Sequence, residues 1–88
     1  MDMEVVLHPK FLKELKKLPA QQQRQFTERL DLFLEDRSHA ILGIHPLHGR
    51  LAGLKSMNVS GDLRALFEEK PRMVTFYKIG THHQLFGK

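Results

Sequence analysis

The spacing of apolar side chains changes partway along this 88-residue chain, and the change limits the folds that the chain can adopt. Between residues 9 and 36, apolar residues recur every three or four positions, as on one face of a helix. In the second half, Leu63, Ala65 and Phe67 occupy alternate positions, as on one face of a strand. A chain of this length forms a single domain, here residues 1–88, so helices and strands must share one core.

Two helices are predicted in the first half, over residues 9–18 and 20–36. Pro9 suits the first turn of the first helix, and Pro19 prevents that helix from continuing. Because the link is so short, the two helices should form an antiparallel hairpin. Their core-facing residues are expected to be Phe11, Leu12, Leu15 and Leu18, followed by Phe26, Leu30, Phe33 and Leu34.

The other apolar runs predict strands, and a long irregular segment separates the first of them from the rest. The strands are expected at residues 4–7, 54–59, 62–69 and 73–79, and the irregular segment at 37–53. The chain is therefore expected to be an α+β protein. Its two N-terminal helices should form a hairpin packed on one face of a small, largely antiparallel four-stranded sheet.

Charge and composition narrow the possible functions. The net charge of +4 suits an anionic partner, either nucleic acid or an acidic protein segment, although solubility alone would also explain it. The chain has no cysteine, which excludes disulfides and thiolate catalysis. Its first residues lack the features of a secretory signal, and it has no apolar run long enough to span a membrane. We therefore expect a cytoplasmic protein with no membrane partner.

Several polar residues of the second half could cleave RNA without a metal. That reaction needs a base for the ribose 2′-OH, an acid for the leaving oxygen and a cation for the phosphate. Histidine, carboxylate and arginine groups suit these roles. The candidates are His45 and His48 in the irregular segment, Asp62 and Arg64 on one predicted strand, and His82 and His83 after the last strand.

Each candidate also has an ordinary structural interpretation. Surface histidines are usually only solvated, Asp62 suits a turn, and Arg64 could pair with Asp62 or Glu68. His45 and His48 are spaced as a weak zinc motif, but without cysteine or a nearby carboxylate a metal site is not expected. No cofactor is expected either. Phe86 suits either a core position or a stacking surface for a base.

Three segments carry a resemblance to a known family. Residues 45–55 read H-P-L-H-G-R-L-A-G-L-K, residues 59–67 read V-S-G-D-L-R-A-L-F, and residues 79–86 read I-G-T-H-H-Q-L-F. With the helical F-x-K-x-L-K-K-L pattern before them, they resemble the YafQ branch of the RelE/ParE toxin superfamily over nearly the whole chain. The resemblance implies the toxin of a type II toxin–antitoxin system, a ribosome-dependent and metal-independent mRNA endoribonuclease. It implies a cognate antitoxin with an acidic segment as partner, and operator DNA bound only through the antitoxin complex.

The resemblance also implies roles for individual residues. His82 matches the general acid, His45 a base or phosphate ligand, and Asp62 a base or orienting carboxylate. Arg64 lies where the RelE branch has a phosphate-stabilising arginine, and Phe86 matches an aromatic that packs near the mRNA. Further RNA contacts are expected from His48, Arg50, Lys55, His83, Lys10 and Lys13.

Two positions depart from the YafQ pattern. Asn58 stands where that branch usually has a second histidine, and Leu63 stands where a tryptophan is common. Asparagine forms hydrogen bonds but does not exchange protons near neutral pH. Two alternatives therefore stay open, a non-nucleolytic ParE-like toxin that inhibits gyrase and a degenerate module that binds only antitoxin and operator.

Overall fold

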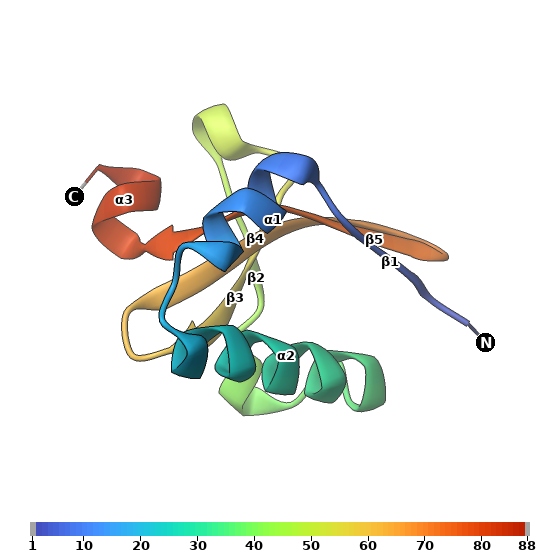
Figure 1. Cartoon of the computed structure of the whole chain (residues 1–88). Coiled ribbons are helices and arrows are strands. Elements are labelled where there is room, and N and C mark those ends of the chain that lie inside the picture. The colour runs from blue at the N-terminus through green and yellow to red at the C-terminus, as the bar shows by residue number, and fades with distance from the viewer. Residues whose placement is uncertain (1, 88) are drawn as a thin grey trace.

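The computed structural model describes residues 2–87, which form one α+β domain (Figure 1). Its sheet has five strands in the order β1-β5-β4-β3-β2, of which β1 is parallel to β5 and the other pairs are antiparallel. The predicted fold class is confirmed, although the sheet has one strand more than expected. The elements are β1 (Glu4–Leu7), α1 (Pro9–Lys16), α2 (Ala20–Glu35), β2 (His45–Pro46), β3 (Lys55–Ser60), β4 (Leu63–Lys70), β5 (Met73–Thr81) and α3 (His82–Phe86), with 3-10 turns η1 (Ala40–Leu42) and η2 (Gly49–Leu51).

Two prolines set the bounds of the first two helices. Pro9 is the first residue of α1, and the His8 ring caps the helix by accepting a hydrogen bond from the Lys10 amide at 3.1 Å. Pro19 separates α1 from α2, and its carbonyl accepts the first amide bonds of α2. The Gln23 side chain donates to the carbonyls of Leu18 at 2.8 Å and Lys16 at 3.4 Å, which joins α2 to the link and to the end of α1.

Both helices pack on one face of the sheet through a cluster of aromatic rings. The rings of Phe11 in α1 and Phe26 in α2 lie 5.6 and 5.3 Å from that of Phe76 in β5, and 5.1 Å from each other. Phe33 and Phe67 extend the cluster along α2 and β4. All five are at most 2% exposed, so this face of the sheet is closed to solvent.

The prediction that Leu34 faces the core is wrong, because its side chain is 48% exposed. Phe26 and Phe33 lie two helical turns apart and define the buried line of α2. Leu34 lies about 100° around the helix from Phe33, which places it on the solvated flank.

The chain from residue 37 to 53 is less irregular than predicted, because it contains β2 and two 3-10 turns. β2 is an edge strand of two residues, in which His45 pairs with Ser56 and Pro46 with Lys55. So short a strand has no alternation that a sequence pattern would reveal. Among residues 2–87, no helix has the length and hydropathy to cross a membrane.

Candidate functional site

The face of the sheet opposite the helices carries the first group of candidate residues. In the strand register His45 pairs with Ser56, Ser56 with Leu66, and Leu66 with Lys78, which makes one row across four strands. Partners in an antiparallel pair point to the same face. Met57 belongs to the core on the helix side, so the row beside it points away from the helices.

The next row along the strands contains Asn58, Arg64 and Gly80. It points to the same face as the first row, because the strands advance by two residues between rows. Arg64 is half-buried, and its Nη1 donates to the carbonyls of Gly61 at 2.8 Å and Leu63 at 3.2 Å. Its guanidinium is therefore held over the turn between β3 and β4.

Asp62 does not lie on a strand, contrary to prediction. It is exposed in the turn before β4, which begins at Leu63. Asp62 and Arg64 therefore do not share a strand face, and among residues 2–87 Arg64 forms no ion pair with Asp62 or Glu68. The glycine before Asp62 has φ +42°, which suits a tight turn, so local turn geometry decides the position of this carboxylate.

The His45 ring is oriented by a backbone carbonyl. Its Nδ1 lies 3.0 Å from the Gly43 oxygen. A carbonyl can only accept, so we assign the hydrogen to Nδ1, which leaves the Nε2 lone pair available. His45 is exposed, and Nε2 can therefore take a proton from a bound group.

His82 and Phe86 form a second group at the end of β5. They lie one turn apart on α3, and their ring centroids are 4.8 Å apart. Phe86 is half-buried against His82 and does not belong to the main core. Sequence reasoning missed α3, although its signal is present, because Thr81 caps the helix and its amide bonds the Gln84 side chain in a capping box.

Gly80 allows α3 to fold back closely over β5. A Cβ atom at this position would lie 2.9 Å from Gln84 Oε1 and 3.3 Å from Gln84 Cβ. Gly80 pairs with Arg64, so α3 begins two residues after the β5 position that pairs with Arg64. Glycine at the start of the G-T-H run is thus explained by the close packing of Gln84 against it, and no turn requires it.

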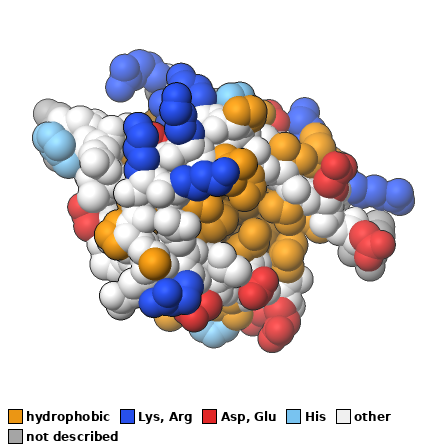
Figure 2. All heavy atoms as spheres, viewed as in Figure 1, with side chains coloured by type: hydrophobic (Ala, Val, Ile, Leu, Met, Phe, Trp, Pro, Cys, Tyr) orange, Lys and Arg blue, Asp and Glu red, His pale blue; other side chains and the backbone are white. Residues whose placement is uncertain are grey.

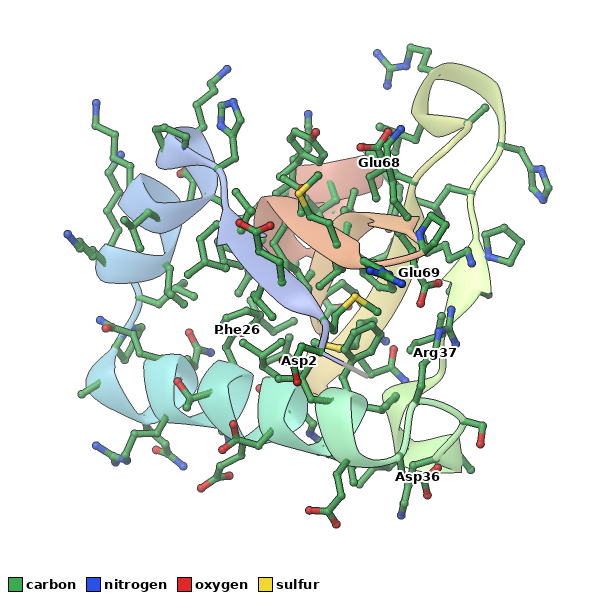
Figure 3. The ribbon with its side chains drawn as sticks, turned by 90° about the vertical axis from the view of Figure 1, so that its right-hand side faces the viewer. Asp2, Phe26, Asp36, Arg37, Glu68 and Glu69 are labelled. Atoms are coloured by element: carbon green, nitrogen blue, oxygen red, sulfur yellow. The ribbon has the colours of Figure 1, made fainter. Side chains whose placement is uncertain are left out.

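Lys55 lies on the other face and is held in a salt bridge. It pairs with Phe67, whose ring is in the core, so it points to the helix side of the sheet. Its Nζ lies 2.9 Å from Glu69, and Arg37 Nε and Nη2 donate to both oxygens of the same carboxylate at 2.6 Å (Figure 3). The Arg37 hydrogen bonds are the main cause that lowers the pKa of Glu69 to about 2, with Lys55 adding to the effect.

The remaining predicted contacts are spread over the exposed surface. His48 and Arg50 are exposed at η2, His83 on α3, and Lys10 and Lys13 on α1. Figure 2 shows basic side chains gathered over the region of α1. Residues 2–87 contain no group of three or more His, Asp or Glu side chains placed to hold a metal ion.

Sequence reasoning missed Lys78. It is exposed at the opposite end of the row from His45, where it adds a cation to the sheet face that points away from the helices. Lys78 lies two residues before Gly80, so the two residues share one face of the strand. This two-residue spacing is the sequence signal that could have placed Lys78 at the site. The sheet face opposite the helices thus has an arginine, a lysine and a histidine with an available lone pair.

Comparison with known proteins gives the class of the fold. No family model matches the chain, and no curated protein matches it. Among solved structures, YafQ from E. coli has a TM-score of 0.80 at 21% identity, covering 98% of this chain and 100% of YafQ. YafQ in the E. coli DinJ-YafQ toxin-antitoxin complex gives 0.78 at 22% identity, with 99% and 100% covered. The archaeal RelE-RelB complex from Pyrococcus horikoshii gives 0.71 at 23% identity, with 92% and 96% covered.

The chain therefore has the fold of the RelE/ParE toxin superfamily. Within that fold its arrangement is YafQ-like, since the YafQ structures superpose with higher TM-scores than the RelE structure does. The resemblance of the sequence motifs is confirmed at the level of the fold.

Proposed function

We propose that this protein is the toxin of a type II toxin–antitoxin system and cleaves mRNA on the ribosome without a metal. The observation that carries the proposal is the sheet face opposite the helices in a YafQ-like fold. On it, Arg64 and Lys78 lie in neighbouring rows with His45, whose Nε2 is available. These groups supply the proton acceptor and the cations that phosphate cleavage by a ribose hydroxyl needs, and His82 at the end of β5 is the candidate acid for the leaving oxygen.

The chemistry moves two protons and exchanges one bond to phosphorus. The 2′-oxygen attacks the adjacent phosphorus while a base, for which His45 Nε2 is our candidate, takes its proton. The bond from phosphorus to the 5′-oxygen breaks, and His82 gives that oxygen a proton. The products are a 2′,3′-cyclic phosphate and a 5′-hydroxyl, and the charge that builds on the phosphate is stabilised by Arg64 and Lys78.

Arg64 must rearrange to act in this way. Its guanidinium donates to the Gly61 and Leu63 carbonyls and has to release at least one of them to reach a phosphate. Both partners are neutral carbonyls, and hydrogen bonds from arginine to a phosphate are stronger than those to neutral acceptors. The turn between β3 and β4 thus serves as the resting position of the arginine.

The expected partners are an antitoxin, the ribosome and mRNA. The YafQ and RelE structures similar to this chain are described as complexes with DinJ and RelB. A net charge of +4 suits an acidic antitoxin segment as well as rRNA. We place the protein in the cytoplasm with those partners, and on operator DNA only through the antitoxin complex.

The test is to map mRNA ends by primer extension after induced expression. Wild type should produce new ends within translated codons and should slow growth. His82→Ala should lose both while the protein stays folded, because His82 is exposed and outside the core. Arg24→Ala, an exposed change on the outer side of α2, is the matched control and should cleave like wild type.

Two results would count against the proposal. Full cleavage by His82→Ala would remove the acid from the mechanism. Gyrase-dependent DNA damage with intact mRNA would favour a ParE-like toxin instead.

A further inference from the structure

A cavity of about 620 Å³ opens between α1, the second half of β5 and α3. β1 pairs with β5 only from Met73 to Phe76, after which the chain turns away at His8 to begin α1 (Figure 1). Within residues 2–87, the edge of β5 beyond Phe76 therefore has no strand beside it on the β1 side. The volume lies within the range of about 300–1,000 Å³ that is usual for ligand sites.

The lining of the cavity is basic. Lys10 and Lys17 reach it from α1 and Lys78 from β5, against the single carboxylate of Glu14, so the lining carries a net charge of three minus one, or +2. None of the three lysine ammonium groups is in an ion pair or hydrogen bond within the described part of the chain. They are available to bind an anion, and phosphate is the anion that such a cluster of lysines suits.

One wall of the cavity is aromatic. The register of β4 and β5 shifts so that Leu66 pairs with Lys78 and Phe67 with Phe76, which leaves Tyr77 without a partner on β4. The Tyr77 ring lies 5.4 Å from the His8 ring at an angle of 41°. Tyr77 is half-buried, and its hydroxyl forms no hydrogen bond within residues 2–87. A partly exposed ring with an available hydroxyl suits a nucleobase, by stacking and by a polar contact.

We propose that this cavity binds one nucleotide of the single-stranded RNA that flanks the cleaved phosphate, an inference that rests on the proposed function. The base lies on Tyr77, and the phosphates contact Lys10 and Lys78. Lys78 connects the two sites, because it lines the cavity and also stands in the row that contains His45. α3 forms the other wall through Gln84 and carries His82 in its first turn. An RNA strand bound in the cavity would therefore continue toward His82.

An acidic peptide is the competing occupant, since it would also neutralise the lysines. The aromatic wall and the position of Lys78 favour RNA. A peptide needs neither a stacking surface nor continuity with the row of His45 and Arg64. The two occupants therefore differ in how strongly they depend on the Tyr77 ring.

The test measures fluorescence anisotropy of a short, labelled 2′-O-methyl RNA, which cannot be cleaved by 2′-OH attack, with the full-length protein at several KCl concentrations. Tyr77→Leu should weaken binding by about 5- to 50-fold, the loss of one stacked base, and should leave the salt dependence unchanged. Lys10→Gln should reduce the slope of log K against log salt by about 0.7, the loss of one phosphate contact to a single strand. Tyr77→Phe keeps the ring and loses only the hydroxyl, so it should lose much less affinity than Tyr77→Leu, which separates stacking from misfolding.

Lys70→Gln is the charge-matched control, because Lys70 is exposed at the last position of β4, at the far end of the β4–β5 pair. It should bind like wild type. Equal losses in Lys70→Gln and Lys10→Gln would mean diffuse charge rather than a site, and wild-type affinity in Tyr77→Leu would overturn the stacking role. A labelled peptide of alternating Glu and Leu that loses affinity in Lys10→Gln but not in Tyr77→Leu, when neither change weakens RNA binding, would assign the cavity to an acidic peptide. If the binding test fails but the wild-type protein still cleaves mRNA, the cavity proposal is wrong and the proposed function stands. If the wild-type protein does not cleave mRNA, the proposed function is wrong whatever the binding test shows.

Discussion

The carboxylate of Glu69 offers a quantitative test of how the segment after α2 is held to the sheet. It joins Arg37, which follows α2, to Lys55 on β3, and its pKa falls from an ordinary 4.5 to about 2. At about 1.4 kcal/mol for each pH unit, that fall corresponds to at most about 3 kcal/mol of folding stability. The Arg37 and Lys55 side chains remain 41% and 37% exposed, so solvent screening reduces the expected value to about 1–2 kcal/mol.

The perturbation is Glu69→Gln, which keeps the shape of the side chain and removes its charge. In urea unfolding near neutral pH it should lose about 1–2 kcal/mol, or about 5–15 °C in melting temperature for a domain of this size. Glu68→Gln is the matched control, because the neighbouring carboxylate points to the other face and forms no ion pair among residues 2–87 (Figure 3). It should stay close to wild type.

The pH dependence gives the sign of the effect. Because folding lowers the pKa of Glu69, its contribution is complete above about pH 4.5 and is lost as the pH falls toward 2. Stability of wild type should therefore fall more steeply than that of Glu69→Gln over this window. Equal urea midpoints at neutral pH, together with parallel pH profiles, would refute the reasoning.

Four further substitutions test the packing and the site. Gly80→Ala should displace α3, lowering cleavage more than stability, as judged by mRNA mapping beside thermal melting, because its Cβ would meet Gln84; unchanged cleavage would contradict this. Phe33→Ala should cost about 3–5 kcal/mol in urea unfolding, whereas Leu34→Ala should stay within about 0.5–1 kcal/mol of wild type; similar costs would contradict the assigned faces of α2. Arg64→Ala should reduce the rate of ribosome-bound mRNA cleavage by about 100- to 1,000-fold without lowering stability by a comparable factor, and a wild-type rate would exclude the arginine from the site.

Much of the fold followed from the period of the apolar residues. α1, α2 and the strands of the second half could be predicted because each buries one face over several turns or several alternations. β2 could not, since two residues carry no period. The parallel pairing of β1 with β5 joins residues far apart in sequence, and no local pattern specifies such a pairing.

Site residues on strands could be predicted, because alternation along a strand determines which face a side chain occupies. Site residues in turns could not, because their positions depend on the backbone conformation of the turn. Arg64 could be assigned to a strand, but Asp62 could not be separated from it, because the bounds of the turn depend on backbone conformation at Gly61. Lys55 was assigned to the RNA-binding set by its charge, although it shares a face with Phe67 and is engaged by Glu69. Charge alone does not reveal which lysine has a partner, and three-dimensional contacts were needed for that distinction.

The most direct test of the central claim is to replace one nucleotide of a ribosome-bound mRNA with its 2′-deoxy form at the mapped cleavage site, in buffer containing EDTA. If the proposed mechanism is right, the unmodified mRNA is cut to a 2′,3′-cyclic phosphate and a 5′-hydroxyl despite the chelator, and the deoxy substitution abolishes the cut at that position alone. Cleavage that persists at the deoxy nucleotide, or that stops when EDTA is added, would contradict the metal-free attack of the 2′-OH proposed for this protein.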